Sequence, residues 1–358
     1  MLTINHTQVP NTDQTNFPYL FNTTDPLLAT TAYNGHVASP NGYDIIFTSD
    51  AAGQNILNYE MEEYNPATGQ VVVWVKIPLL SHTQDTVIYV WYGNASITTL
   101  QSQPSSAWDS RFKGVWHFRN GTTLSTNDST ANGNNGTNYG AIAAPGQINE
   151  GASFNENSNY VDVGNLGNFP TQGTIEFWMQ PSSLSSYPNA FSTNYNGGND
   201  AIRFEEDSSG DFDAIIGNGN FNGYALMAGT MQSGAWYHIA LTWDSISSNA
   251  IGYVNGAQVF NTNSSNLWPA TIPDLAIGSG FASYRDWNGL IDEARISTAA
   301  RSADWVATEY NNESSPSTFY TLYPENTVKV VPTPRGDAYK LLYATGVQMG
   351  EKGIWKIP

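Results

Sequence analysis

The chain carries one stretch that decides its fold, Trp236-Tyr-His-Ile-Ala-Leu-Thr-Trp243, which leads into Gly252-Tyr-Val-Asn-Gly256. Aromatic and aliphatic residues fill the first segment, and an Asn-Gly pair closes the second. This pattern is typical of β-strands that end at tight turns.

Runs of the same kind recur outward from this stretch, and Gly/Asn turns separate them. Strand spacing of this sort predicts a β-sandwich or jelly roll from about residue 114 to residue 324. The strands expected there are Val115–Phe118, Ala152–Phe154, Tyr160–Val163, Gly173–Gln180, Ala201–Phe204, Phe212–Ile216, Trp236–Trp243, Ala250–Val254, Leu275–Ile277 and Gly289–Ile296.

Residues 1–98 also predict short strands, at Leu2–Val9, Tyr43–Thr48, Val71–Ile77 and Thr86–Tyr92. The segment Val71-Val-Val-Trp-Val75 is almost continuously apolar, which favours a strand that is buried on both faces. We therefore expect an all-β protein with two β-sandwich domains.

The remaining segments complete the predicted organisation. Residues 99–113 are expected to be a linker between the domain at 1–98 and the jelly roll at 114–324. Residues 301–311 predict one short amphipathic helix, capped by Ser302, that closes one end of the sandwich. Residues 325–358 hold five of the thirteen basic residues and are expected to be a docking arm or an extra strand on their own domain.

The composition limits the possible partners. The formal net charge of −18 disfavours nucleic acid and anionic membrane surfaces, which require Lys and Arg. No apolar run is long enough for a membrane span, and the N-terminus lacks the features of a signal peptide. The absence of cysteine excludes thiol catalysis and thiolate metal sites.

One loop has the composition of a cation site. Residues 127–136 read Asn-Asp-Ser-Thr-Ala-Asn-Gly-Asn-Asn-Gly, and calcium binds side-chain and backbone oxygens of this kind. The same residues also suit an ordinary hairpin loop, because Asn-Gly is a turn signal in its own right.

Six segments in a fixed order carry a resemblance to known proteins. They are Gly114-Val-Trp-His-Phe118, the loop from Asp128 to Gly136, Thr174-Ile-Glu-Phe-Trp-Met179, the two segments quoted first, and Gly289-Leu-Ile-Asp-Glu-Ala-Arg-Ile296. Together they resemble the concanavalin-A-like, laminin-G-like jelly roll of bacterial and phage surface proteins. Residues 1–98 are similar to a β-rich domain of unknown function that often precedes it.

The resemblance implies a sandwich that binds glycans or proteins, and it implies a structural calcium ion. In relatives the Asp/Asn/Gly loop and the Ile-Asp-Glu strand lie together at that ion. The metal ligands expected on this basis are Asp128, Asn132, Asn134, Asp292 and Glu293.

Aromatic residues in Asn/Gly-rich loops suggest a sugar-binding platform, because sugars stack on exposed aromatic rings. The ligand-binding residues expected on this basis are Tyr195, Tyr224, Trp268, Tyr284 and Trp287.

No catalytic constellation stands out in the sequence, so no catalytic residue is assigned. Glu205-Glu-Asp207 is contiguous and is interpreted as a solvated strand end. The side chains of Glu60, Glu62 and Glu63 alternate in part toward one side of the chain, as glycosidase carboxylates do. No aromatic groove for a sugar is evident near them in the sequence. His117 and His238 lie within strand patterns and are expected to be packed core residues.

The function expected from the sequence is a non-catalytic, lectin-like adhesion protein that binds a glycan or a neighbouring structural protein. We expect it to be extracellular, on a virion surface as a phage decoration or tail-associated component, with a bacterial cell surface or secretion as the alternative. It is a possible homo-oligomer. The alternative functions are a purely structural assembly subunit and a secreted glycan-active enzyme.

Overall fold

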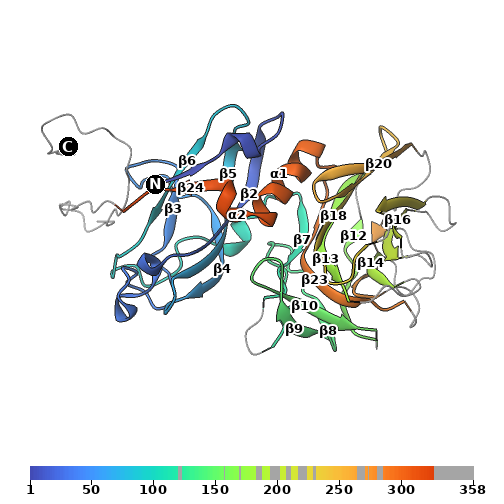
Figure 1. The fold of residues 1–358 in the computed structure, drawn as a ribbon, viewed down its shortest axis with the longest axis horizontal. Helices are drawn as coiled ribbons and strands as arrows, with labels where there is room; N and C mark the ends of the chain where they lie inside the picture. The colour runs from blue at the N-terminus through green and yellow to red at the C-terminus, as the bar shows by residue number, and fades with distance from the viewer. Residues whose placement is uncertain are drawn as a thin grey trace, which may run out of the picture.

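The structure is a computed structural model, and it shows two β-rich lobes side by side with two short helices between them (Figure 1). It describes residues 1–119, 123–156, 158–168, 171–182, 188–193, 202–206, 211–216, 224–228, 231–263, 271–272, 274–279 and 285–325. None of the helices in these ranges is long and apolar enough to cross a membrane. The predicted all-β class is confirmed.

The first lobe contains two antiparallel sheets. One has the strand order β24-β1-β6-β3, and the other has the order β2-β5-β4. The strands are β1 Leu2–Ile4, β2 Gln14–Thr24, β3 Ile46–Thr48, β4 Tyr59–Asn65, β5 Gln70–Leu80, β6 Thr86–Trp91 and β24 Tyr320–Leu322. Short 3-10 helices lie at η1 His6–Gln8, η2 Pro26–Leu28, η3 Thr31–Tyr33 and η4 Pro104–Ser106.

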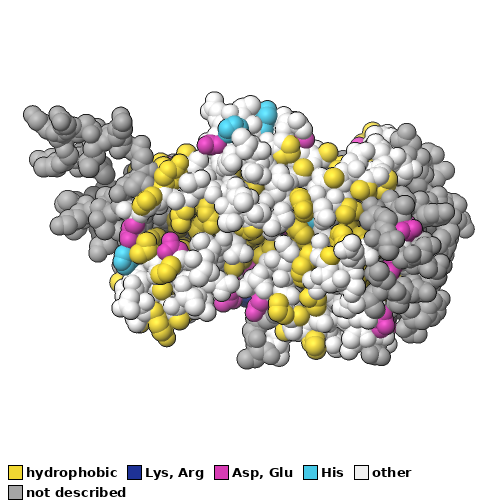
Figure 2. Space-filling view, in the orientation of Figure 1, with side chains coloured by type: hydrophobic (Ala, Val, Ile, Leu, Met, Phe, Trp, Pro, Cys, Tyr) yellow, Lys and Arg dark blue, Asp and Glu magenta, His cyan; other side chains and the backbone are white. Residues whose placement is uncertain are grey.

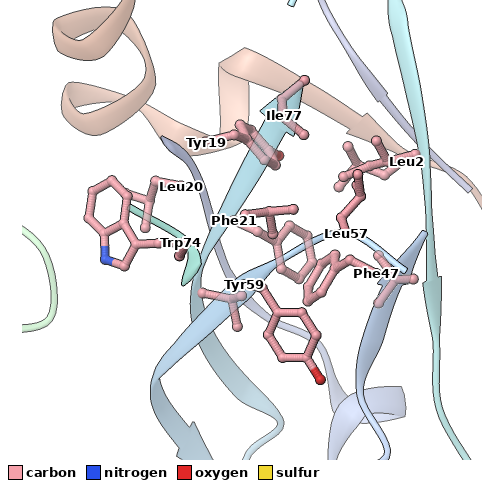
Figure 3. Close-up of a cluster of buried hydrophobic side chains, with 14 of the residues drawn as sticks. Leu2, Tyr19, Leu20, Phe21, Phe47, Leu57, Tyr59, Trp74 and Ile77 are labelled. Carbon is pink, nitrogen blue, oxygen red and sulfur yellow. The ribbon is translucent and has the colours of Figure 1, made fainter. Parts of the chain in front are cut away.

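Aromatic rings fill the space between these two sheets. Figure 3 shows Phe21, Phe47 and Tyr59 turned toward one another from different strands. The ring centroids of Phe21 and Phe47 are 5.6 Å apart, and those of Phe47 and Tyr59 are 5.5 Å apart. Edge-on pairs at this distance add to the stabilisation that burial of the rings already gives.

Strand β5 is buried on both faces, as its apolar run predicts. All five residues from Val71 to Val75 have no exposed surface. One face belongs to the core of the first lobe, whereas Trp74 points out of that core (Figure 3) and packs on Trp108 and His117. The second lobe therefore covers what would otherwise be the solvent face of this sheet.

The second lobe is a sandwich of two larger antiparallel sheets. One has the order β20-β19-β18-β13-β23-β10-β9 with β7 added against β23, and the other has the order β17-β16-β15-β14-β22-β11-β8. A further pair joins β12 Gly167–Asn168 to β21 Thr271–Ile272. Phe177 of the first sheet stacks on Phe191 of the second, with centroids 5.7 Å apart.

The first sheet of this sandwich is formed by β7 Phe112–Trp116, β9 Ile142–Pro145, β10 Glu150–Asn155, β13 Gln172–Pro181, β18 Tyr237–Asp244, β19 Asn249–Val254, β20 Ala257–Asn263 and β23 Asn288–Ser297. The second sheet is formed by β8 Thr137–Tyr139, β11 Tyr160–Gly164, β14 Asn189–Thr193, β15 Ile202–Glu206, β16 Phe212–Ile216, β17 Tyr224–Ala228 and β22 Leu275–Ile277.

Strand β23 is irregular in its middle. Its first half pairs with β10 up to Ile291, and its second half pairs with β7 from Ala294 onward. Its register with β13 shifts between these halves, and Glu293 has a φ of 50°, in the left-handed region that non-glycine residues rarely adopt. Such a bulge changes where the neighbouring side chains point.

Helix α1 Ala303–Ser314 starts at Ser302, whose hydroxyl accepts a hydrogen bond from the backbone N–H of Trp305 at 3.1 Å. This cap was predicted, but the predicted position of the helix at one end of the sandwich is wrong. Trp305 packs edge-on against Phe17 of the first lobe, whereas Tyr310 stacks on Trp178 of the second. The helix therefore lies between the two lobes (Figure 1).

The segment after α1 also departs from the predicted division at residue 324. Helix α2 Pro316–Phe319 buries Phe319 in the first core, and β24 pairs with β1. Residues 316–322 therefore belong structurally to the first lobe, so the chain enters that lobe twice. The predicted linker at 99–113 likewise contributes Trp108 and Phe112 to the core of the first lobe.

Loss of the Asn312 side chain is expected to destabilise the contact between helix and sheet. The Asn312 amide forms hydrogen bonds with both backbone groups of Leu20 on edge strand β2. It accepts one from the Leu20 N–H at 2.7 Å and donates one to the Leu20 carbonyl at 3.0 Å. Asn312→Ala leaves both groups buried without a partner, so we expect the free energy of unfolding to fall by about 2–4 kcal/mol.

Urea denaturation measures this change. The matched control is Asn311→Ala, which removes one hydrogen bond from Asn311 Nδ2 to the Gln8 carbonyl in a less buried place and is expected to cost about 1 kcal/mol. Equal losses in the two variants would contradict the anchoring role of Asn312.

Candidate functional site: a polar pocket between the lobes

A pocket of about 380 Å³ opens where the two lobes meet. The first lobe supplies its β4 side chains, and the second supplies the segment after β7 and the loop that contains Asp128. The lining residues are Glu60, Met61, Glu62, Pro104, Ser105, His117, Phe118, Arg119, Ser125, Asn127, Asp128, Ser129 and Thr130. Neither lobe forms this pocket alone.

The His117 imidazole lies among three carboxylates at the base of this pocket. Its Nδ1 is 2.8 Å from both carboxylate oxygens of Glu293 and 3.7 Å from Oε2 of Glu62. Its Nε2 is 3.5 Å from Oε2 of Glu60, outside hydrogen-bond geometry. The Glu62 and Glu293 side chains are 1% and 0% exposed, so this cluster is almost completely removed from water.

Two tryptophans fix the glutamates of β4. Trp108 Nε1 donates to Glu60 Oε2 at 2.6 Å, and Trp74 Nε1 donates to Glu62 Oε2 at 2.8 Å. The Ser129 hydroxyl donates to the other oxygen of Glu60 at 2.7 Å. Both glutamates are therefore held by groups that belong to the junction and not by their own strand.

Burial separates the pKa values of these carboxyl groups. Burial, together with the nearby charge of Glu293, raises the pKa of Glu62 to about 8. Burial would also raise the pKa of Glu60 and of Glu293, but the His117 charge outweighs it and lowers both. Burial alone would lower the pKa of His117, because it opposes the charged imidazolium. The negative charges of Glu293 and Glu60 outweigh this effect, so the pKa of His117 is raised.

Arg295 extends this network into the helix. Its guanidinium is 2.8 Å from Glu293 Oε2 and 2.6 Å from Glu313 Oε1 on α1. It also lies over the Trp74 ring, 4.4 Å from the centroid, in cation–π geometry. One buried cation thereby joins β23, α1 and the first lobe.

The predicted calcium loop has a different internal arrangement from the one expected. The Asp128 carboxylate accepts hydrogen bonds from the backbone N–H groups of Val115, Thr130 and Asn134 and from the Thr130 hydroxyl, all at 2.8–3.0 Å. These four donors occupy the lone pairs that an ion would need. The loop residues therefore do not fit a calcium ion in this arrangement, and calcium stays a prediction.

The other predicted ligands are also engaged within the chain. Amide Nδ2 of both Asn132 and Asn134 donates to the Lys113 carbonyl. The buried Asp292 carboxylate accepts from the backbone N–H of Ile148 and of Glu293. In the described part of the chain no hydrogen bond joins Asp128 to Asp292 or Glu293. Glu293 instead meets His117, which lines the same pocket as Asp128.

Most of the predicted sugar platform lies outside the described residues, namely Tyr195, Trp268 and Tyr284. Tyr224 begins strand β17, but its side chain is not among those described. Trp287 was wrongly expected in an exposed loop, because it is 1% exposed and packs in the jelly-roll core near Phe212.

Two further interpretations of acidic residues were wrong. Glu205 and Glu206 are buried, and Glu205 forms ion pairs with Arg203 and Arg285, so this is not a solvated strand end. Glu60 and Glu62 do lie against aromatic rings, those of Trp108 and Trp74. The predicted burial of His117 and His238 is confirmed.

Comparisons with known proteins agree with this architecture. Residues 155–307 match the model of the concanavalin A-like lectin/glucanases superfamily, in its laminin-G form. The second lobe has the concanavalin A-like jelly-roll fold. Residues 41–112 match a domain of unknown function, which confirms the predicted order of the two domains. No curated protein sequence matches the chain.

Several solved structures are similar to part of this chain, with little sequence identity. Domain 4 of an extracellular arabinanase from Geobacillus stearothermophilus, in complex with arabinotriose, is 20% identical over 56% of this chain and 98% of that one, with a TM-score of 0.43. The binding domain of Paraclostridial Mosquitocidal Protein 1 is 15% identical over 56% of this chain and about half (52%) of that one, with a TM-score of 0.46.

A third structure is the sialidase carbohydrate-binding module of Ruminococcus gnavus bound to sialyllactose. It is 15% identical over 40% of this chain and 83% of that one, with a TM-score of 0.35. Likeness at these levels carries no information about the ligand or activity of this chain.

His238 is expected to give the junction a measurable acid sensitivity. Burial, with the Arg295 charge, lowers its pKa to about 3, so the folded protein keeps the imidazole neutral where the unfolded chain becomes protonated. Its contribution to stability is thus complete above about pH 6.5 and is lost, at about 1.4 kcal/mol per pH unit, as the pH falls from there toward 3.

His238→Gln removes this dependence. The destabilisation that it causes in urea should therefore be smaller at pH 5 than at pH 7 by about 2 kcal/mol. The control is Tyr310→Phe, which alters a ring 6.3 Å from the imidazole and keeps His238 in place. A destabilisation by His238→Gln that is the same at both pH values would contradict the assignment.

Proposed function

We propose that this protein is a non-catalytic carbohydrate-binding protein and that the pocket between the lobes holds the sugar. The observation that carries this proposal is the pocket itself, whose volume of about 380 Å³ is in the range of small-ligand sites. Membership of the second lobe in a superfamily of lectins and glucanases supports the ligand class.

The accessible lining is suited to hydroxyl groups. Arg119 and Asn127 are exposed, and Ser105, Ser125 and Ser129 are half-buried at the pocket wall. These side chains offer both donors and acceptors, which a polyhydroxylated ligand needs on neighbouring atoms. Charged side chains are sparse among the coloured atoms on the face of the protein in Figure 2.

The rigid parts of the pocket favour binding without rearrangement. The loop from Ser125 to Asn135 is closed by the hydrogen bonds to Asp128 and by one from the Gly136 N–H to the Thr126 carbonyl at 2.8 Å. A wall that is ordered before the ligand arrives reduces the entropy lost on binding.

A second candidate function is glycan hydrolysis, and one observation favours it. Glycosidases pair a protonated carboxyl group with an ionised one. The pKa of Glu62 is raised, as a proton donor requires, and the pKa of Glu60 is lowered, as an ionised partner requires. Against it, Glu62 is 1% exposed and bonded to Trp74, so its oxygen does not reach the open part of the pocket. Release of reducing sugar that Glu62→Gln abolishes would favour the enzyme.

For its location, we propose an extracellular or virion surface, as inferred from the acidic body and the basic segment beyond residue 325. Removal of residues 326–358 should leave the melting temperature of the body unchanged and abolish its incorporation into a larger assembly. The structure of that segment lies outside the described residues. Loss of cooperative unfolding in the truncated protein would mean that the segment completes the fold.

The binding proposal is tested with two matched asparagine variants. Asn127→Ala removes an exposed amide from the pocket wall, and Asn41→Ala removes an exposed amide from a turn of the first lobe outside the lining. After a glycan array has identified a ligand, we expect Asn127→Ala to weaken its binding about fivefold, the effect of one hydrogen bond, and Asn41→Ala to leave it unchanged.

Isothermal titration calorimetry measures both affinities. Absence of binding to any glycan on the array would reject the proposal and favour a purely structural subunit. Binding that Asn127→Ala and Arg119→Ala both leave intact would place the sugar site elsewhere in the molecule.

A further inference from the structure

A buried cluster at the base of the pocket has the residues and the spacing of a metal centre. One potential ligand atom from each of Glu62, His117 and Glu293 lies within 4.8 Å of the other two. The three residues come from β4 of the first lobe, the position directly after β7 and the bulge of β23. Glu293 was among the metal ligands expected from the sequence, whereas Glu62 and His117 were not, and the loop of Asp128 is not part of this cluster.

Two buried polar atoms in this cluster lack a hydrogen-bond partner within the described part of the chain. They are Oε1 of Glu62 and Nε2 of His117, and both side chains are at least nine-tenths buried. Nearly all buried polar atoms in proteins are satisfied, so the unsatisfied Oε1 of Glu62 indicates a group that binds there, whereas Nε2 of His117 faces Glu60.

The charges of the cluster point to a cation. Four carboxyl groups, those of Glu60, Glu62, Asp292 and Glu293, lie at this position, and the cationic groups that contact them are His117 and Arg295. Buried carboxylates are costly unless cations or protons neutralise them. A divalent ion that displaced a proton from this cluster would neutralise its carboxylates in the same way.

We propose that Glu62, His117 and Glu293 bind one divalent transition-metal ion, of which Zn²⁺ is the test case, and that this ion joins the two lobes. One imidazole nitrogen with two carboxylates suits Zn²⁺ and not Ca²⁺, which binds six to eight oxygens. Of the three residues, His117 and Glu62 also line the pocket between the lobes.

The tautomer of His117 is consistent with this assignment. Nδ1 faces Glu293 and Glu62 and would lose its proton to bind the ion, whereas Nε2 keeps its proton and faces Glu60. Proteins commonly orient a metal-bound histidine with a carboxylate behind it, and Glu60 Oε2 lies 3.5 Å from Nε2, without hydrogen-bond geometry in this structure. Trp108 and Ser129 hold Glu60 in that position, so we assign it as a positioning residue and not as a ligand.

Metal binding to the full-length protein tests the proposal, and it does not depend on a glycan. After treatment with chelator and dialysis, titration calorimetry with ZnCl₂ should show one tight site per chain, and Zn²⁺ should raise the melting temperature. X-ray absorption at the zinc edge should show one imidazole and oxygen ligands. The same titration with CaCl₂ should show much weaker binding.

Matched variants assign the site. Glu62→Gln keeps an oxygen that accepts from Trp74 Nε1, so it should fold and lose the tight site, whereas Glu63→Gln, one residue along β4, should keep it. Glu60→Gln should weaken binding about tenfold to a hundredfold. His82→Asn, which removes an exposed histidine paired with Asp13, controls for zinc on surface histidines and should have no effect.

Either of two results would overturn the proposal. One is the absence of a tight Zn²⁺ site in the unaltered protein. The other is a Glu62→Gln protein that folds normally, as judged by circular dichroism, and binds Zn²⁺ as tightly as the unaltered one.

Discussion

The structure depends on one buried cation. The Arg295 guanidinium is 1% exposed, pairs with Glu293 and Glu313, and stacks over Trp74. A buried guanidinium is tolerated only with partners of good geometry, so the position of Arg295 fixes those of its partners. Because they come from β23, α1 and β5, this one requirement sets how the helix and the two lobes meet.

The bulge in β23 makes this arrangement possible. A regular strand would alternate Asp292, Glu293, Ala294 and Arg295 strictly between the two faces of the sheet. The extra residue opposite β13 and the left-handed backbone at Glu293 break that alternation, so Ile291 and Ala294, three residues apart, both lie in the jelly-roll core. Glu293 and Arg295 contact each other outside that core, where the first lobe meets the sheet. Strained conformations of this kind are costly and persist where the surrounding structure determines them.

Periodicity and composition were sufficient to predict ten strands of the jelly roll and the buried strand β5, because these depend on local alternation and on apolar content. The jelly-roll strands β8, β9, β12, β14, β17, β20 and β21 were not predicted, and neither was β4 of the first lobe. Strand β2 was missed, since Pro18 usually argues against a strand. Pro18 is tolerated because β2 is an edge strand, and the backbone of Leu20, two residues along, bonds Asn312 and not another strand.

The pocket could not be predicted in the same way. Glu60 and Glu62 precede His117 by more than fifty residues and belong to another domain, so their proximity depends on how the two domains pack. No local pattern carries that information. The aromatic candidates failed for a related reason: a Trp such as Trp287 in a Gly/Asn-rich segment can lie in a turn or be folded back into the core, and the composition is the same in both cases.

The polar character of the junction bears on why the two domains occur together. A purely apolar contact between the lobes would stabilise the protein but would tolerate small shifts, whereas ion pairs and hydrogen bonds such as Arg295–Glu313 and Trp108–Glu60 each require one geometry. The pocket takes its walls from both lobes and would change shape with any shift between them. We infer that the domain of unknown function provides half of the pocket. The buried charges hold that half in a fixed position relative to the jelly roll.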